Sequence, residues 1–149
     1  KELEGIDLCL KILTDLGVPF CKTAGKHTIV ISLIKTRRAL KGMQTKDLSC
    51  SPIMANGTRL KAMKMMNALS EKAYWTLPNL FPLIVLKMVR WSVKHGVCKY
   101  SAVAFLWYGL LQVAVFGDFK TGREFSKVAW DLQRRLNAKD LFSKMSLIA

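Results

Sequence analysis

PNLFPLIVLKMVRWSVKHG (78–96), followed by VCKYSAVAFLWYGLLQVAVFGD (97–118) and FKTGREFSKVAWDLQRRLN (119–137), is the stretch that decides the fold. In the third piece apolar residues recur every three or four positions and charged residues fill the opposite face, which is the pattern of an amphipathic helix. The second piece is apolar on nearly all sides, which favours a buried helix. The stretch therefore predicts three consecutive helices joined by very short turns.

Two glycines in this stretch carry specific expectations. Gly117 suits the position just after a helix because glycine tolerates positive φ. Asp118 can then cap the next helix by accepting hydrogen bonds from its free amides, so the pair predicts a tight helical hairpin. Gly109 interrupts an apolar helix at a cost of about 1 kcal/mol relative to alanine, and we therefore expect close contact between helices there.

The chain before this stretch reads as helices separated by polar loops. A stripe of leucines and isoleucines marks a first helix that ends before Gly17. The β-branched run at 28–31 also suits a strand, but it does not alternate polar and apolar, and the KTRRALKG that follows is strongly helical. We therefore predict a helix there, with these residues facing inward: Val30, Leu33, Ile34 and Leu40.

These segments predict one domain, residues 1–149, which we expect to be a piece of a longer protein. The chain begins with Lys rather than Met, and its last stretch is cut short within an apolar run. Start and stop signals place the helices at about 1–16, 28–41, 59–75, 79–95, 101–116 and 119–136, with the start of another from about 139.

Successive antiparallel pairs of helices indicate a helical-repeat array. The hairpin at 102–136 has roughly the 34-residue length of one tetratricopeptide unit. Gly122 and Ala129 fit the small positions of the second helix of that unit. The predicted fold class is therefore all-α, with antiparallel hairpins stacked as a tetratricopeptide-like right-handed solenoid that is truncated at both ends.

Composition favours a folded protein in a reducing compartment. Hydrophobic residues make up 51% of the 149 residues, which is ample for a core. The first residues are charged and no short apolar segment follows them, so we expect no secretory signal. Cys9, Cys21, Cys50 and Cys98 are widely spread without a C-x-x-C pair, which favours free thiols over disulfides or zinc. We predict a cytoplasmic location and no cofactor or metal.

The net charge of +14 is unevenly distributed. Residues 16–70 contain ten Lys and Arg against a single Asp47, a net charge of +9. A basic surface can attract nucleic acid, anionic lipid or an acidic partner, but no nucleic-acid-binding motif accompanies the charge, so a solvated basic face is the simpler interpretation. The candidate interaction surface consists of Lys35, Arg37, Arg38, Lys41, Lys87, Arg90 and Lys94.

No pattern in the chain indicates catalysis. Gly25-Lys26 imitates part of a phosphate-binding P-loop, but Phe20 stands where the motif needs glycine and His27 where it needs Ser or Thr. His27 and His95 have no recognisable nucleophile and carboxylate arranged with them. The chain is therefore predicted not to be an enzyme.

The 18 uncharged residues at 100–117 raise a rival interpretation, a transmembrane helix. Gly109 and Gln112 lie within that run, and it leads directly into an amphipathic helix of the soluble type. A membrane span usually contains about 20 strongly apolar residues. The buried inner helix of an array is therefore the preferred interpretation.

Seven segments carry a family resemblance: KTRRALKGM (35–43), DLSCSPIM (47–54), RLKAMKMMNAL (59–69), AYWTLPNLFPLIVLKMV (73–89), SVKHG (92–96), SAVAFLWYGLL (101–111) and FGDFKTGREFSKVA (116–129). Together they resemble the long helical region of large multi-domain sensor kinases. In those proteins a protein-kinase-like part and an AAA-type, STAND-like ATPase precede this region, and a GAF sensor and a histidine kinase follow it. Asn56-Gly57 departs from the family's usual acidic-Pro turn.

The resemblance implies a non-catalytic linker that mediates interdomain or protein–protein contacts in a signal-transduction ATPase–kinase. Its partners would be the neighbouring ATPase and sensor or kinase domains of the same chain. A curved array of this kind would relay nucleotide or ligand state through rigid-body shifts. The alternative is a basic helical module that binds nucleic acid or an anionic membrane surface, with the salt dependence that such binding brings.

Overall fold

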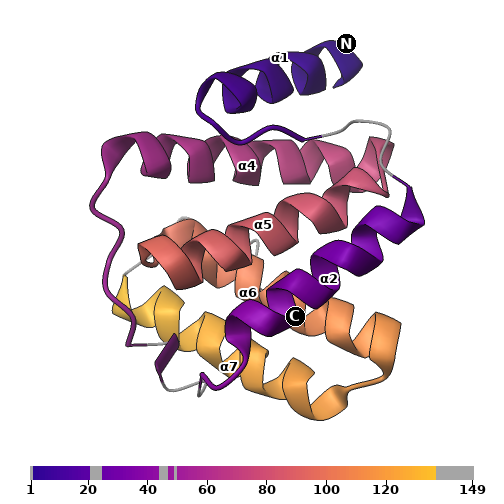
Figure 1. The fold of residues 1–149 in the computed structure, drawn as a ribbon. Helices are drawn as coiled ribbons and strands as arrows, with labels where there is room; N and C mark the ends of the chain where they lie inside the picture. Colours follow the sequence, from indigo (N-terminus) through magenta and orange to yellow (C-terminus); the bar gives the residue numbers. More distant parts are fainter. Residues whose placement is uncertain (1, 21–24, 44–46, 49, 137–149) are drawn as a thin grey trace.

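A computed structural model describes residues 2–20, 25–43, 47–48 and 50–136. The predicted all-α class is confirmed over these ranges, while Cys21 and the helix expected from about 139 lie outside them. The six long helices are α1 (Glu2–Asp15), α2 (Lys26–Leu40), α4 (Gly57–Thr76), α5 (Leu80–His95), α6 (Lys99–Phe116) and α7 (Phe119–Arg135), all drawn in Figure 1.

Three helices, α2, α4 and α6, begin two residues earlier than predicted, and polar side chains explain two of these starts. Asn56 accepts a hydrogen bond from the amide of Arg59 at 3.1 Å, and α4 begins two residues ahead of the predicted start. The hydroxyl of Ser101 accepts a hydrogen bond from the amide of Cys98 at 3.0 Å, and α6 likewise begins two residues early. Each contact gives a hydrogen-bond acceptor to a backbone amide near the start of a helix. The spacing of apolar residues does not reveal such hydrogen bonds.

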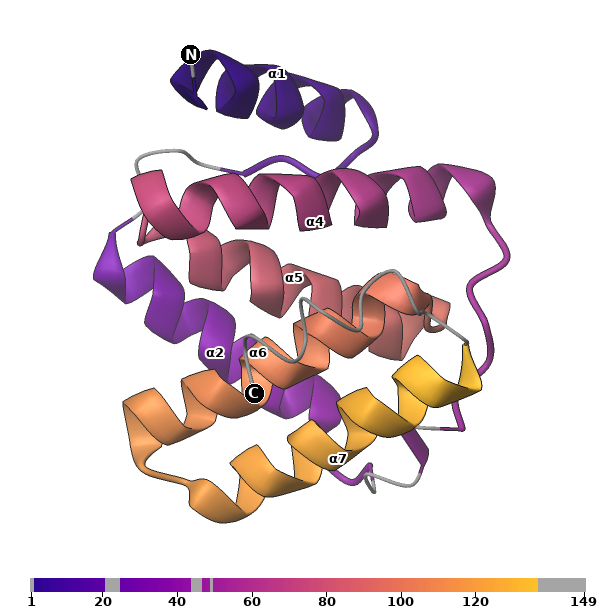
Figure 2. The same ribbon diagram turned by 180° about the vertical axis from the view of Figure 1, so that it is seen from behind.

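The helices pack around α5. This helix contacts α4, α6 and α2, and α2 lies across it in Figure 1. α1 packs mainly on α4, and α6 pairs with α7, so α1 and α7 lie at opposite ends of the molecule (Figures 1 and 2). The first two helices therefore pack mainly onto later helices rather than onto each other, whereas α4 to α7 stack in chain order.

α6 and α7 approach so closely that both need a glycine at the contact. A Cβ added at Gly109 would lie 3.0 Å from the carbonyl oxygen of Gly122, and one added at Gly122 would lie 2.6 Å from Cγ2 of Val113. Gly117 ends α6 with φ 64°, and Asp118 caps α7 by accepting a backbone hydrogen bond at 3.1 Å. The predicted tight hairpin and the close contact at Gly109 are confirmed.

The predicted inward face of α2 is wrong at two positions. Val30 is 53% exposed and Ile34 is 47% exposed. The helix is rotated because its contact with α5 is partly polar: Arg90 of α5 donates hydrogen bonds to this side of α2. The residues of α2 that are buried are Ser32, Leu33 and Thr36.

Within the described ranges, α6 is the one helix long and apolar enough to cross a membrane, with a mean hydropathy of 1.3 over its 18 residues. Half of it is buried inside the structure, including Phe105, Tyr108 and Gly109. Length and composition are weak evidence for a span here, because the core helix of a folded domain has the same properties.

Candidate functional site

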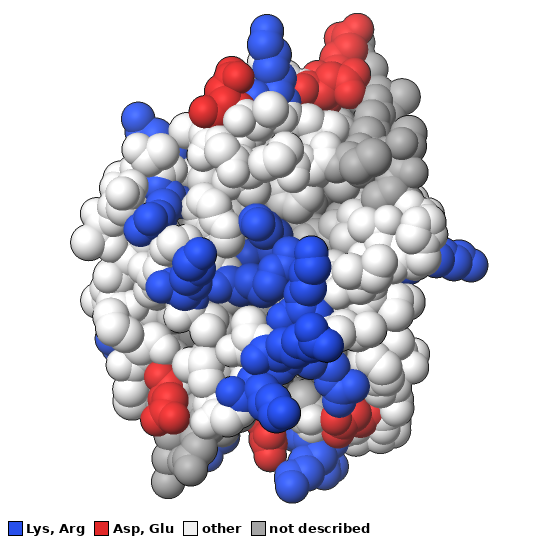
Figure 3. Space-filling view, in the orientation of Figure 1, with Lys and Arg blue, Asp and Glu red and all other residues white. Residues whose placement is uncertain are grey.

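Six of the seven residues of the candidate interaction surface come from two helices that pack together, α2 and α5, and Lys41 directly follows α2. Figure 3 shows Lys and Arg side chains gathered in a band on the face where α2 lies across α5 in Figure 1. Four of them form what we call the cationic cluster: Lys35 on α2, and Lys87, Arg90 and Lys94 on α5.

Arg90 joins α5 to α2. Its Nη1 donates to the hydroxyl of Ser32 at 2.8 Å, to the carbonyl oxygen of Ser32 at 3.2 Å and to the hydroxyl of Thr36 at 2.9 Å. All three acceptors are uncharged, and burial lowers the pKa of the guanidinium. The hydrogen bonds therefore hold a positive charge in a partly buried place without neutralising it.

Lys87 adds a second partly buried cation. Burial is the main cause that lowers the pKa of its amine. The positive charges of Arg90, Lys35 and Lys94 lower it further. Among the residues that the structure describes, no carboxylate forms an ion pair with any of these four side chains. Within the described part of the chain, the cluster thus concentrates positive charge with no carboxylate paired to it.

A groove of about 210 Å³ opens between α2 and α5 beside this cluster. Lys35, Lys87 and Arg90 line it together with the hydroxyl-bearing Thr28 and Ser32. Phe20, Ile31 and Leu83 contribute apolar walls. Because a carboxylate or phosphate would gain charge-assisted hydrogen bonds there and relieve the repulsion between the cations, the arrangement is suited to binding an anion.

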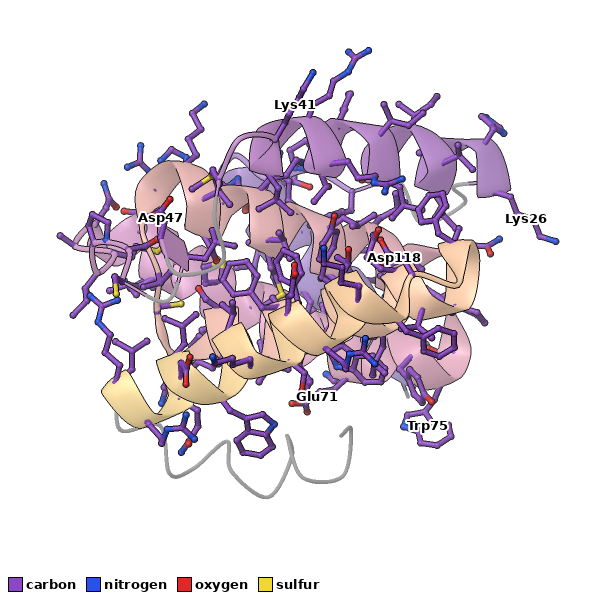
Figure 4. The ribbon with its side chains drawn as sticks, turned by 90° about the horizontal axis from the view of Figure 1, so that it is seen from below. Lys26, Lys41, Asp47, Glu71, Trp75 and Asp118 are labelled. Carbon is purple, nitrogen blue, oxygen red and sulfur yellow. The ribbon has the colours of Figure 1, made fainter. Side chains whose placement is uncertain are left out.

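The other three predicted surface residues lie outside the cationic cluster, and Lys94 of the cluster does not line the groove. Arg38 and Lys41 are exposed, and in Figure 4 Lys41 projects outward at one end of α2. Arg37 points toward α6, where its guanidinium lies 4.5 Å from the ring centre of Phe116. Hydrogen bonds from Thr121 lower the pKa of Asp118, and the charge of Arg37 adds to this lowering. The structure thus separates the cationic cluster from the other three residues of the predicted surface.

Two exposed apolar features were missed by the sequence analysis. Ile31 and the neighbouring Val30 and Ile34 leave an aliphatic strip beside the groove. Trp75 is 80% exposed, projects away from the molecule in Figure 4, and packs edge-on against Tyr74 with ring centres 4.9 Å apart. In the sequence, the one sign of this strip is that apolar residues lie on more than one face of the predicted helix.

The described histidines and cysteines are scattered. No group of three His, Cys, Asp or Glu side chains converges as a metal ion would require, within the ranges that the structure describes. Cys9, Cys50 and Cys98 are free thiols, and burial raises the pKa of Cys98. His95 packs edge-on against Trp91, with ring centres 5.3 Å apart.

Comparison of the chain with protein-family models, with curated proteins and with solved structures found no match.

Proposed function

We propose that this chain is a non-catalytic helical scaffold within a multi-domain signalling ATPase–kinase, and that the groove between α2 and α5 docks an acidic segment of a neighbouring domain. The observation that carries the proposal is the cationic cluster, in which Lys35, Lys87, Arg90 and Lys94 come together without a carboxylate among the described residues. The stacking of α4 to α7 in chain order supports a tetratricopeptide-like arrangement.

The groove favours a partner segment that is both acidic and apolar. Arg90 is held in place by three hydrogen bonds before any partner arrives, which reduces the entropy lost on binding. Lys35 and Lys87 flank the same cavity, whereas Ile31 and Leu83 offer apolar contact. A segment in which Glu or Asp alternates with Leu or Ile would satisfy both kinds of surface.

Docking in the groove can affect the rest of the helical stack, because α2 contacts α5, and α5 contacts both α4 and α6. A carboxylate that draws Lys35 and Lys87 together would change how α2 sits on α5. Neighbouring helices in such stacks move as rigid bodies. We therefore propose that occupation of the groove shifts α2 relative to the α4–α7 stack and so signals from one domain to the next.

The same features support an alternative, in which the cluster binds nucleic acid or an anionic membrane surface. The exposed aliphatic strip formed by Val30, Ile31 and Ile34 favours the membrane within this alternative, because apolar side chains beside cations can enter the headgroup region.

Size-exclusion chromatography tests the proposal. The purified chain is mixed at micromolar concentration with the ATPase and sensor domains encoded on either side of it, and in parallel with a DNA duplex and with phosphatidylserine vesicles. We expect a complex with one of the two domains that dissociates as salt is raised. If neither domain binds while the duplex or the vesicles do, the scaffold role is wrong and the alternative replaces it.

A further inference from the structure

A second cavity, of about 430 Å³, opens where the first turns of α4 and α6 meet the end of α7. Its volume lies within the range of about 300–1,000 Å³ that is typical of small-molecule sites. None of its lining residues lines the groove between α2 and α5, so it is a separate place on the molecule. Its walls are mostly apolar and consist of Ile53, Met54, Leu60, Cys98, Tyr100 and Leu136.

The connector that leads into α4 forms one wall of this cavity, and backbone hydrogen bonds hold it in place. The amide of Met54 donates to the carbonyl oxygen of Val97 at 2.8 Å, and the amide of Val97 donates to that of Pro52 at 2.8 Å. Gly96 permits this approach, because a Cβ there would lie 2.8 Å from the carbonyl oxygen of Pro52. Ile53, between the two bonds, is 60% exposed, so its side chain is accessible to a molecule in the cavity.

Three lysines complete the lining: Lys61 and Lys64 on α4, and Lys99 at the start of α6. Lys61 and Lys64 are neighbours on the helix surface and both are exposed. Nζ of Lys99 lies 5.3 Å from the ring centre of Tyr100, which places this cation beside an apolar wall. No Asp or Glu belongs to the described lining. Such a cavity is suited to a molecule with an apolar body and an anionic end.

We propose that this cavity binds a free fatty acid, with its alkyl chain against the apolar walls and its carboxylate among the three lysines. A small anion such as phosphate would leave the apolar walls uncovered, whereas an alkyl chain covers them. Each CH₂ group that leaves water should tighten binding by up to about fourfold. The proposal goes beyond the scaffold role and does not depend on it.

Isothermal titration of the whole chain tests this site, with decanoate as the probe at concentrations where it forms no micelles. We expect decanoate to bind. Octanoate is two CH₂ groups shorter and should bind more weakly, by up to about fifteenfold. Decyltrimethylammonium has an alkyl chain of the same length and the opposite charge, and it should bind at least about tenfold more weakly than decanoate.

A substitution in the exposed part of the wall locates the binding. Ile53→Asp places a carboxylate where the alkyl chain would lie, and it should weaken decanoate binding at least about tenfold. Val115→Asp is the matched control, because Val115 is 52% exposed and lies outside the cavity. It should leave the affinity for decanoate unchanged. Both positions are exposed, so we expect both variants to fold.

A second pair of variants tests the lysines. Lys61→Gln/Lys64→Gln should weaken decanoate binding at least about threefold. Lys120→Gln/Lys127→Gln removes the same charge from exposed positions of α7 outside the cavity, and it should bind as the wild-type chain does. The proposal is wrong if decanoate does not bind to the wild-type chain, or if either test variant binds it no more weakly than its control does.

Discussion

The guanidinium of Arg90 lies 2.9 Å from the hydroxyl of Thr36, which is 54 residues earlier in the chain. This contact and two to Ser32 make the interface between α2 and α5 polar at its centre. This polar interface determines which face of α2 is buried, and it holds the guanidinium of Arg90 at the edge of the groove. Fold and candidate site therefore depend on the same side chain.

The hydrogen bond between Arg90 and Thr36 predicts a measurable loss of stability. Thr36→Val keeps the shape of the side chain but removes the acceptor, so we expect the free energy of unfolding to fall by about 1.5–3 kcal/mol, as for hydrogen bonds to charged groups. Thr14→Val is the matched control, because both threonines donate to the carbonyl oxygen four residues earlier at 2.8 Å, but Thr14 is exposed. Denaturant unfolding of both variants is the measurement. Equal losses would show that the cross-helix bond contributes nothing.

Two Gly→Ala changes should have opposite effects on stability, because only one of them lies at the close contact between α6 and α7. Gly122→Ala should destabilise by about 1–3 kcal/mol, because its Cβ would meet Val113 at 2.6 Å and the carbonyl oxygen of Gly109 at 3.2 Å. Gly57→Ala, at the start of α4, meets nothing within 4 Å and should stabilise by about 0.4–1 kcal/mol through the unfolded chain. A rise in Tm for Gly122→Ala would contradict the close packing of these helices.

The acid side of the stability curve should depend on His95. Burial lowers the pKa of His95, and the charges of Arg59, Lys94 and Lys87 lower it further. The unfolded chain therefore takes up this proton first, near the usual pKa of about 6.5. Stability should fall as the pH drops from there through the lowered pKa.

His95→Asn removes this titrating group. We expect the difference in free energy of unfolding between neutral and mildly acidic pH to be smaller in the variant than in the wild-type chain, whatever the variant's absolute stability. Urea unfolding at a series of pH values measures that difference. Curves with the same pH slope would mean that folding leaves the proton affinity of His95 unchanged.

The predictions that succeeded rest on local chemistry. Gly117 and Asp118 define a turn through their own backbone and side-chain preferences, and Gly109 signals close packing by its cost in a helix. The spacing of apolar residues predicted that the helices exist. It did not predict where α4 and α6 begin, because those starts depend on hydrogen bonds made by Asn56 and Ser101.

The predictions that failed or were missing depend on contacts between distant segments. Nothing near Val30 or Ile34 indicates that Arg90 will occupy the inner side of α2. Lys87, Arg90 and Lys94 recur every three or four residues along α5, but bringing Lys35 to them requires the packing of α2. Gln112 is a polar residue within a long apolar helix, and only the packing of the helices shows that it is completely buried.

The most direct test of the docking groove compares the affinities of two charge-reversed variants. Lys35→Glu/Lys87→Glu changes the groove, whereas Lys120→Glu/Lys127→Glu changes the net charge by the same amount on exposed positions of α7. Fluorescence anisotropy follows a labelled peptide of alternating Glu and Leu at low salt. We predict that the wild-type chain binds it, that the groove variant binds at least about tenfold more weakly, and that the α7 variant stays within about threefold of the wild type. Equal weakening in the two variants, or no binding by the wild-type chain, would contradict the account.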